Sequence, residues 1–378
     1  MQKEGGRTLS KSIVLILIAC SLCLAGSLGW CQGQNVEVHG YLLNRFYTNP
    51  SMSARFVMER ISLSTVAKIG EDATAYVEFY IHPWITDRVL GTAPNLYTAE
   101  QSRTYTESAY VDLPLGSGRI RIGKGRQLNF GIMPSYPNRR TSQYGIFSET
   151  FTQDRIQGFQ WYAKKGQVDG GLSFFTDHNL GYRAIGDCAG TVAGVDTQLH
   201  ICDRDNSANN SGRMAVSAKV GVTKPNFQWH VSGCVGRLNP SQLGPVQPFV
   251  PAGSTNTDTT HNKFAVDAVW NSGPFFVQCE WARGRFSLLG ITGYQISVGW
   301  QEKGKPSYVV KWAALNNNKP PTDNPVTWNV QQLTLGYVHP IRKNVWLEMN
   351  YEKNLTSNPA GTTDPDNDIL MWEIFTGF

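Results

Sequence analysis

Hydrophobic and polar residues alternate along nearly all of the chain beyond about residue 35. The stretch 368–378 shows the pattern clearly, because Leu370, Trp372 and Ile374 fall on one face and Glu373 falls on the other. A period of two predicts β-strands, in which successive side chains point to opposite faces. Helical periodicity is absent apart from short pieces in the connections. The predicted strands cover residues 36–47, 55–69, 74–83, 106–115, 119–128, 155–164, 168–176, 213–223, 227–238, 263–270, 275–286, 294–301, 308–316, 327–339, 345–354 and 369–378.

The connections between these strands sort by length. Seven are short and carry the Gly, Pro and Asn that tight turns require, at 70–72, 116–118, 165–167, 224–226, 271–274, 302–305 and 340–344. The connections that alternate with them are longer, at 84–105, 129–154, 177–212, 239–262, 317–326 and 355–368, with two modest ones near 48–54 and 287–293. This sorting predicts an all-β fold, a transmembrane antiparallel β-barrel of about 16 strands with short periplasmic turns and long extracellular loops. A soluble β-sandwich would also show alternating hydrophobic and polar residues, but it gives no reason for short and long connections to alternate along the chain.

A membrane barrel has to close, because an open sheet edge leaves backbone polar groups unsatisfied in lipid. We therefore expect the last strand, 369–378, to pair with both 345–354 and 36–47. On that last strand, Glu373 should face the lumen, and the outward residues should face lipid. Those outward residues are Leu370, Trp372, Ile374 and Phe378. An odd or open strand count would contradict this interpretation.

Composition narrows the class of protein further. Charged residues make up only 17% of the chain and glycine occurs 37 times, which suits a turn-rich β-protein with a large apolar exterior. The net charge of +5 is too small and too dispersed to indicate nucleic-acid binding. Residues 1–33 predict a secretory signal peptide, with a basic start and an apolar core at 12–25. A lipidated Cys20 and a retained anchor helix are the alternatives. Residues 34–378 then form one barrel domain in a bacterial outer membrane.

One interior region carries a series of short motifs. They are Tyr110-Val111-Asp112, Arg121-Ile122-Gly123-Lys124, Phe130-Gly131 and Arg155-Ile156-Gln157-Gly158, preceded by Arg60, Ser62-Leu63-Ser64 and Lys68-Ile69-Gly70. The series resembles the phosphate-selective porin O and P family, and the porin superfamily more widely, over roughly residues 55–176. The resemblance implies that the loop after 119–128 folds into the lumen and that the protein assembles as a homotrimer. Asn129 stands where that family commonly has a Pro, so no solute preference is carried over.

The expected pore lining lies around the same loop, 132–154. Charges at a narrowing with low-dielectric walls decide which ions enter a channel. The basic candidates are Arg121, Lys124, Arg126, Arg139, Arg140 and Arg155, opposed by Asp112, Glu149 and Asp154. Further inward-facing charges are Lys219, Lys263 and Lys311, against Glu78, Asp267, Glu280 and Glu348. This mixed wall predicts a passive diffusion channel for small hydrophilic solutes or ions, with a mild anion preference if the basic residues face the lumen.

Two points about these candidates stay open. Arg139 and Arg140 either narrow the pore, decorate an exposed loop, or pair with Glu149 and Asp154 to hold the loop. The sequence Gly123-Lys124-Gly125 allows a β-bulge, so the faces of Lys124 and Arg126 depend on the register.

Other chemistry finds little support in the sequence. Cys188 and Cys202 bracket a Gly-rich loop, and a disulfide between them suits an oxidising compartment. The same loop holds His178 and His200, and a solvated polar loop is favoured over a divalent-cation site there. No zinc spacing and no nucleophile elbow occurs, so we expect no metal, no cofactor and no catalysis.

Two competing functions remain, and one partner is expected. The alternatives to a channel are an adhesin or surface-binding scaffold that uses the loops 177–212 and 239–262, and an outer-membrane hydrolase. Phe378 resembles the terminal aromatic that the barrel-assembly machinery recognises in bacterial outer-membrane proteins.

Overall fold

The computed structural model of the chain describes residues 36–49, 52–82, 103–132, 144–153, 155–185, 199–203, 212–357, 359 and 367–378. The first strands are β1 (Val36–Asn49), β2 (Met52–Ile69), β3 (Ala73–His82), β4 (Arg103–Leu115), β5 (Gly118–Arg126), β6 (Arg155–Lys165) and β7 (Val168–Thr176). The later ones are β10 (Met214–Thr223), β11 (Phe227–Arg237), β12 (Thr260–Ser272), β13 (Phe275–Phe286), β14 (Leu289–Trp300), β15 (Ser307–Asn317), β16 (Asn329–Arg342), β17 (Val345–Ser357) and β18 (Ile369–Gly377). Short elements lie between them: α2 (Ile146–Phe151), β8 (Leu180–Ala184), β9 (Leu199–Asp203), η1 (Pro240–Gln242), η2 (Gly244–Phe249) and η3 (Pro325–Thr327).

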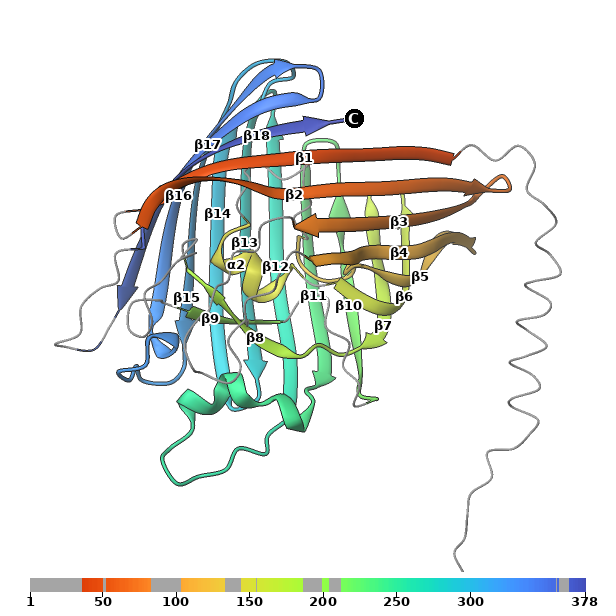
Figure 1. The fold of residues 1–378 in the computed structure, drawn as a ribbon. Coiled ribbons are helices and arrows are strands. Elements are labelled where there is room, and N and C mark those ends of the chain that lie inside the picture. Colours follow the sequence, from red (N-terminus) through yellow and green to blue (C-terminus); the bar gives the residue numbers. More distant parts are fainter. Residues whose placement is uncertain are drawn as a thin grey trace, which may run out of the picture.

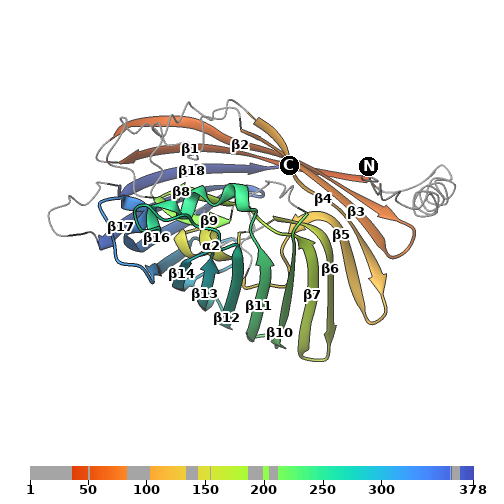
Figure 2. The ribbon, with the colours of Figure 1, turned by 90° about the horizontal axis from the view of Figure 1, so that it is seen from below.

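Sixteen strands of the described residues close into one antiparallel barrel (Figures 1 and 2). Each strand pairs with its neighbours along the chain, with β7 pairing directly with β10. The barrel closes where β18 pairs with both β17 and β1, in a register that runs from Tyr41–Gly377 to Thr48–Leu370. All the predicted segments coincide with barrel strands, so the predicted strand number and closure are confirmed.

Tight turns connect neighbouring strands at one end of the barrel, and the residues in these turns favour the required backbone conformation. Gly116, Gly166 and Gly273 begin the turns after β4, β6 and β12, with φ values of 61°, 63° and 56°. Glycine adopts a positive φ without the steric cost that a Cβ imposes, and two-residue hairpin turns require it. Asn344 takes the same conformation between β16 and β17, with φ at 59°, as its short polar side chain permits.

One connection at the opposite end is tighter than predicted. β13 and β14 are joined by Ser287 and Leu288, with Ser287 at φ 62°, where the sequence indicated a modest connection over 287–293. The predicted strand began late because Gly290 and Gly293 interrupt the alternation of side chains. Backbone pairing with β13 continues through both glycines, since a ladder needs only N–H and C=O groups.

The β-bulge that the sequence allowed at Lys124 of β5 lies instead on the neighbouring strand, β4. β5 pairs with β4 and β6 without a register shift, whereas the β3–β4 register shifts so that Glu107 has no residue opposite it. The extra residue is therefore in β4, and it turns a carboxylate toward the strands that carry the basic candidates. This position was not predicted, because nothing in the local sequence distinguishes Glu107 from its neighbours.

The two faces of the wall differ in the way that a lipid environment requires. On β12, the outward Phe264 is 44% exposed, whereas the inward Lys263 and Asp267 are 3% and 1% exposed. On β18, the outward Ile374 is 46% exposed and Glu373 is fully buried, as predicted. Apolar side chains thus point out and charged ones point in, which is the reverse of a soluble sandwich.

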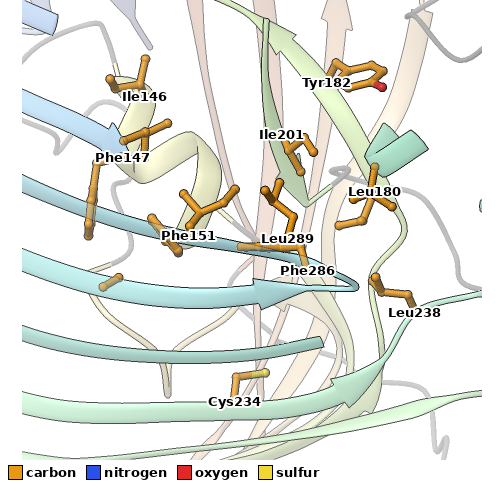
Figure 3. Close-up of a cluster of buried hydrophobic side chains, with 14 of the residues drawn as sticks. Ile146, Phe147, Phe151, Leu180, Tyr182, Ile201, Cys234, Leu238, Phe286 and Leu289 are labelled. Atoms are coloured by element: carbon orange, nitrogen blue, oxygen red, sulfur yellow. The ribbon is translucent and has the colours of Figure 1, made fainter. Parts of the chain in front are cut away.

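A large apolar cluster lies against the inner face of the wall (Figure 3). It joins Phe147 and Phe151 of α2 to Leu180 of β8 and Ile201 of β9. The ring of Phe151 approaches Phe286 of β13 with centroids 6.1 Å apart. The β8–β9 hairpin corrects the expectation of a polar loop throughout 177–212, because packing on α2 and β13 orders apolar pairs too short to show a period. No helix in the described part of the chain has the length and hydropathy to cross a membrane.

Candidate pore lining

The loop after β5 runs directly along the inner face of the wall. Asn129 donates its amide N–H to the Oγ of Ser173 on β7, at 3.0 Å. The backbone N–H of Gly131 then donates to the Oγ of Ser232 on β11, at 3.0 Å. Both acceptors are inward-facing side chains that are 2% exposed. The first residues of the loop therefore pass from β5 toward β11 in contact with the wall.

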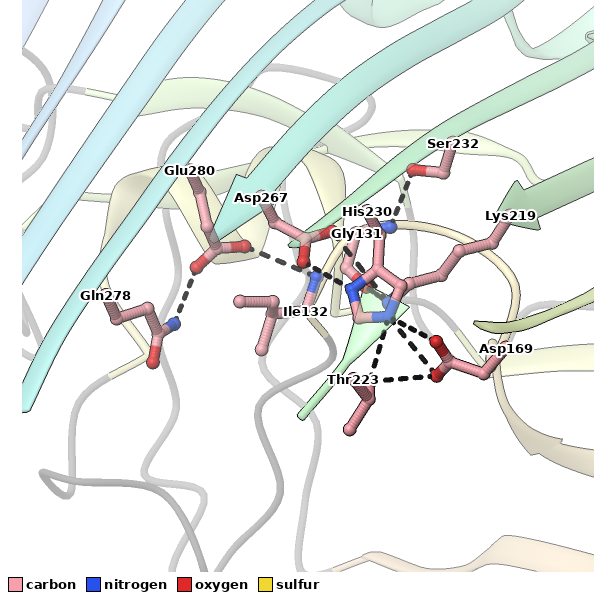
Figure 4. Close-up of polar contacts among 10 residues, drawn as sticks. All are labelled: Gly131, Ile132, Asp169, Lys219, Thr223, His230, Ser232, Asp267, Gln278 and Glu280. Carbon is pink, nitrogen blue, oxygen red and sulfur yellow. Dashed lines mark hydrogen bonds and ion pairs between the residues drawn. The ribbon is translucent and has the colours of Figure 1, made fainter. Parts of the chain in front are cut away.

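Two inward-facing charged side chains contact the backbone of the next loop residues, Gly131 and Ile132 (Figure 4). The backbone N–H of Ile132 points to the Oε2 of Glu280 on β13, at 3.4 Å. The ammonium of Lys219 on β10 donates to the backbone carbonyl of Gly131, at 2.6 Å, and lies 3.8 Å from Asp267. Lys219 is thus engaged with the loop backbone rather than standing alone on the wall.

The loop returns through α2 and contacts the wall again. The backbone N–H of Ile146 donates to the Oε1 of Gln332 on β16, at 3.3 Å. The Nζ of Lys263 on β12 donates to the carbonyl of Phe151, at 3.2 Å. A lysine at the end of a short helix satisfies carbonyl groups that have no partner within the helix. Lys263 therefore stabilises the returning loop.

Helix α2 also contacts the β8–β9 hairpin through polar groups. Thr150 donates its hydroxyl to the carbonyl of Ile201 at 3.2 Å, and its Oγ1 lies 2.9 Å from the Nδ1 of His200. The other ring nitrogen of His200 lies 3.2 Å from the carboxylate of Glu149. Glu149, expected opposite the arginines, is thus placed beside a histidine of β9.

A group of three arginines and one carboxylate lies on the wall formed by β2, β4, β5 and β6. Arg155 forms an ion pair with Glu107, and Arg126 lies 3.7 Å from the same carboxylate. Arg60 places its guanidinium 4.6 Å from the centroid of the Tyr80 ring, a favourable cation–π arrangement. Among the described residues of this group, three arginines therefore surround one carboxylate.

The described part of the loop resumes beside this arginine group. Tyr144 is 8% exposed and lies near both Arg60 and Arg126. Tyr80 and Tyr41 extend the same aromatic surface, with ring centroids 6.3 Å apart. Guanidinium groups here lie among phenol rings, a combination that offers both charge and hydrogen-bond donors to a passing solute.

A second charged group lies nearer the short-turn end, around Asp112. Its carboxylate accepts hydrogen bonds from Arg119 at 2.6 Å, Arg121 at 3.2 Å and the hydroxyl of Tyr162 at 2.8 Å. Arg121 also stacks over the ring of Tyr110, with its guanidinium carbon 3.9 Å from the centroid. Arg121 and Asp112 are thus paired to each other, as two of the predicted pore residues.

A third group surrounds His230 of β11. One ring nitrogen lies 2.9 Å from Asp267, and the other lies 3.3 Å from Asp169 on β7. Thr223 donates its hydroxyl to Asp169 at 3.1 Å. The inner wall here carries two carboxylates around a histidine, so it differs from the two arginine-rich groups.

The remaining candidates are dispersed. Lys124 donates its Nζ to the carbonyl of Thr106 at 2.5 Å. Lys311 lies beside Gly145, where an added Cβ would come within 3.1 Å of its Nζ. The other predicted members, Arg139, Arg140, Asp154, Cys188 and residues 1–33, lie outside the described residues. The Cys188–Cys202 disulfide and the signal peptide therefore stay predictions.

Several residues of these groups were missed as pore candidates. Arg119 shares a face with Arg121 two residues away, so the period of the strand would have found it. His230 shares a face with Ser232 for the same reason. Arg60 was noticed only as part of a motif, and Glu107 gives no signal because its position depends on the bulge. Among the described residues, no cluster of His, Cys, Asp or Glu has the arrangement to hold a metal ion.

Comparison with known proteins identifies the fold. Salmonella typhi OmpF, solved in complex with daunomycin, is 10% identical over 92% of this chain and 98% of its own, with a TM-score of 0.61. An anion-selective porin from Comamonas acidovorans is 13% identical over 91% and 100%, with a TM-score of 0.54. OmpT of Vibrio cholerae in its trimer form is 11% identical over 92% and 100%, also with a TM-score of 0.54. No protein-family model and no curated protein matches the chain. The barrel therefore has the fold of outer-membrane porins.

Proposed function

We propose that this chain is a porin of the bacterial outer membrane, a non-enzymatic passive diffusion channel for small hydrophilic solutes or ions. One observation carries the proposal: a closed barrel presents apolar side chains outward and charged side chains inward. Phe264 and Lys263, neighbours on β12, are 44% and 3% exposed. Such a wall is compatible with lipid outside and water inside. The structural similarity to porins also supports the proposed channel function.

The constriction is proposed where the loop 132–154 approaches the arginine group. Tyr144 lies near Arg60 and Arg126, which supports an approach of the loop to the wall at this point. On the far side, α2 rests on β13 through Phe151 and Phe286. A loop that touches both sides of the barrel narrows the water path between them. Fixed charges beside such a narrowing act strongly on a permeating ion.

A mild anion preference is the proposed selectivity. Arg60, Arg126 and Arg155 outnumber Glu107 at the constriction, which favours anions there. Elsewhere the inner wall is mixed, because Asp169 and Asp267 surround His230. A channel whose inner wall carries charges of both signs holds no solute tightly, so we propose weak selectivity and not a phosphate-specific path.

Export and assembly complete the proposal. Residues 1–33 act as a cleaved signal peptide, and Phe378 presents the aromatic end of β18 to the barrel-assembly machinery. Phe378 is 58% exposed, and its backbone exchanges hydrogen bonds with Gly40 at 2.9 and 3.1 Å, so its ring is displayed outward from an ordered strand. The assembled channel is proposed to be a homotrimer, the form named for the OmpT structure of Vibrio cholerae.

Planar-bilayer recording tests the function directly. Purified, refolded protein should insert in discrete steps of equal conductance that are ohmic at low voltage. A salt gradient across the bilayer should give a small reversal potential of the sign expected for anions. Heat-denatured protein in the same detergent is the control. Insertion without any ohmic conductance would leave a barrel that acts by binding, as an adhesin does.

A further inference from the structure

Two arginines face outward from the wall of the barrel, near the long-loop end of β13. Arg283 and Arg285 are exposed, whereas Ala282 beside them is fully buried among the inner side chains. Successive side chains of a strand point to opposite faces, so both guanidinium groups lie on the side that faces lipid. A charge on this side is costly at the middle of the membrane and much less so at its edges. The depth of the two arginines therefore decides what surrounds them.

A row of aromatic side chains marks the short-turn end of the same face. Phe275, at the start of β13, lies opposite Trp300, which lies opposite Tyr308, and all three are exposed. Such rows lie at the interface between membrane and water. Arg283 and Arg285 lie about 20 and 25 Å further along the membrane normal, for a rise of about 3.3 Å per residue and a strand tilt of about 40°. Since the apolar band of such barrels is about 25 Å tall, both arginines lie at its far edge.

The neighbouring strands change from apolar to polar outward side chains at the same level. Phe264, directly opposite Arg283, is the last apolar outward residue of β12 on the way to the long loops. The polar outward residues that lie beside the arginines or continue their rows on β12, β14 and β15 are Asn262, Thr292 and Asn316. The polar edge thus spans four neighbouring strands, and Arg283 lies where lipid headgroups meet the wall.

The two arginines differ in their protein partners. Arg285 donates from Nη2 to Asp258 at 2.9 Å and from Nε to the carbonyl of Ser287 at 3.1 Å. Within the part of the chain that the structure describes, no residue forms a hydrogen bond or an ion pair with Arg283. A guanidinium presents a fork of donors that matches the oxygens of a carboxylate or a phosphate. An anion from outside the protein is therefore expected beside Arg283.

We propose that Arg283 binds the phosphate of an anionic lipid in the leaflet at the long-loop end. The guanidinium donates two parallel hydrogen bonds to phosphate oxygens. The acyl chains of the lipid lie over Phe264 and Trp281, which are 44% and 39% exposed, and Arg285 adds positive charge nearby. A free phosphate ion makes no such apolar contact, so the occupant is a lipid. The inference rests on the proposed membrane location, because the outward face has to contact a bilayer.

Lipid binding to the purified, delipidated protein in a neutral detergent tests the proposal. Native mass spectrometry should show dioleoyl phosphatidate bound at least about tenfold more tightly than dioleoyl phosphatidylcholine, whose choline group neutralises the headgroup. Equal binding of the two lipids would overturn the assignment to an anionic phosphate. Inorganic phosphate that displaces phosphatidate at an equal concentration would also overturn it, because the site would then recognise the free ion.

Arg283→Leu removes the charge and leaves a side chain suited to a lipid-facing position. Its affinity for phosphatidate should fall by about tenfold or more, to the level of phosphatidylcholine. Arg342→Leu is the matched control, the same substitution at an exposed arginine that ends β16 at the short-turn end, and it should keep the wild-type affinity. Equal losses would reflect general charge attraction and overturn the site. Far-UV circular dichroism checks folding, and Arg283→Gln, with the same expected loss, replaces a leucine variant that does not fold.

Conductance separates the failure of this proposal from failure of the channel. Wild type and Arg283→Leu should conduct equally, because Arg283 lies outside the lumen. Ohmic conductance without a preference for phosphatidate would overturn the lipid site and leave the channel standing. Phosphatidate binding that is lost in Arg283→Leu, in a barrel that never conducts, would overturn the channel and leave the lipid site. A changed oligomeric state in Arg283→Leu would place a second copy of the chain at Arg283 and overturn the lipid as occupant.

Discussion

The two sides of this barrel have the same strands but very different interiors. Along β12 to β16, the inner face is covered by α2, the β8–β9 hairpin and η2, which pack as one apolar cluster that includes Phe151 and Val246. Along β2 to β6, the inner face carries Arg60, Arg126 and Arg155 among tyrosine rings. The first wall packs against these loop elements through an apolar cluster, and the second wall carries the arginine group.

The difference shows how one repeating pattern supports two tasks. Alternation makes a wall with an apolar exterior everywhere, and it says nothing about what covers the inside. Small inward side chains on the covered side, such as Ala282 and Ala313, which are fully buried, leave room for the helix and hairpin. On the opposite side the inward residues are long and charged. Loop packing on one wall therefore confines the proposed path to the other.

Deleting residues 135–149 should have the largest effect, because it removes the loop that we propose constricts the path, together with most of α2. We expect the single-channel conductance to rise by roughly twofold or more, since conductance follows the open cross-section. Planar-bilayer recording measures it. Deleting residues 252–255, which form an exposed turn in the loop between β11 and β12, is the control. An unchanged conductance in the first deletion would place the loop outside the path.

Glu107→Gln should destabilise the charged wall strongly. Glu107 is fully buried and shared by Arg155 and Arg126, so the substitution removes a negative charge on which two guanidinium groups converge. Breaking a buried ion pair costs about 3–5 kcal/mol of unfolding free energy. Urea unfolding followed by tryptophan fluorescence measures the loss. Glu302→Gln, at an exposed turn, should change stability by less than about 1 kcal/mol, and similar losses in both variants would refute the distinction.

Arg60→Ala should lower the anion preference without altering the covered wall. A unit charge at about 8 Å in water attracts an anion and repels a cation by ~0.5 kcal/mol each, so the anion-to-cation permeability ratio should fall by roughly twofold to fivefold, depending on screening by salt. Reversal potentials in a salt gradient report that ratio. Arg237→Ala removes an exposed charge near the end of β11 and should leave the potential unmoved. A shift of the same size in both variants would mean that Arg60 does not line the path.

The smallest expected effect concerns Asp368, which lies between the two walls, at the long-loop end of β17 and β18. Burial raises the pKa of Asp368, but hydrogen bonds from Lys353 at 2.8 Å, the N–H of Asn354 at 2.9 Å and Tyr351 at 3.1 Å outweigh it and hold the pKa below its usual range. A lowered pKa in the folded state stabilises the fold above the unfolded value near 3.9. That stabilisation disappears as the pH falls through the folded pKa.

Asp368→Asn should therefore lower the unfolding free energy at pH 7 by about 0.5–1 kcal/mol, an amount limited by solvent screening. At pH 3 the difference between variant and wild type should shrink, because the wild-type carboxylate begins to protonate. Urea unfolding at the two pH values measures both. A difference that grows toward acid would reverse the assigned sign.

The wall could be predicted from the sequence because its signal is local. Each strand shows its period within about ten residues, and turn residues such as Gly116 and Asn344 mark the ends. Even so, Gly290 and Gly293 hid the start of β14, since the prediction followed side chains and the ladder follows the backbone. The strand number and the closure through β18 followed from the pattern and its parity.

The interior could be predicted only in part, because it depends on contacts between distant segments. Leu180 and Ile201 become a hairpin by packing on α2, and short apolar runs carry no period that would show this. Arg126 and Arg155 lie opposite each other on β5 and β6, but the carboxylate that they share belongs to Glu107, whose inward position comes from a bulge. The sequence therefore predicted which inward residues are charged, but it did not predict which of them form ion pairs.

The ion pair between Arg45 and Glu373 has a consequence for folding kinetics. The two residues are 328 apart in sequence, and their side chains meet at 2.9 Å, buried at the junction of β1 and β18. Contacts of such separation form late, because chain entropy opposes them until the intervening strands have assembled. Until then β1 and β18 expose unpaired edges that other chains can join. The rate at which this junction forms should therefore set how much of the refolding protein escapes aggregation.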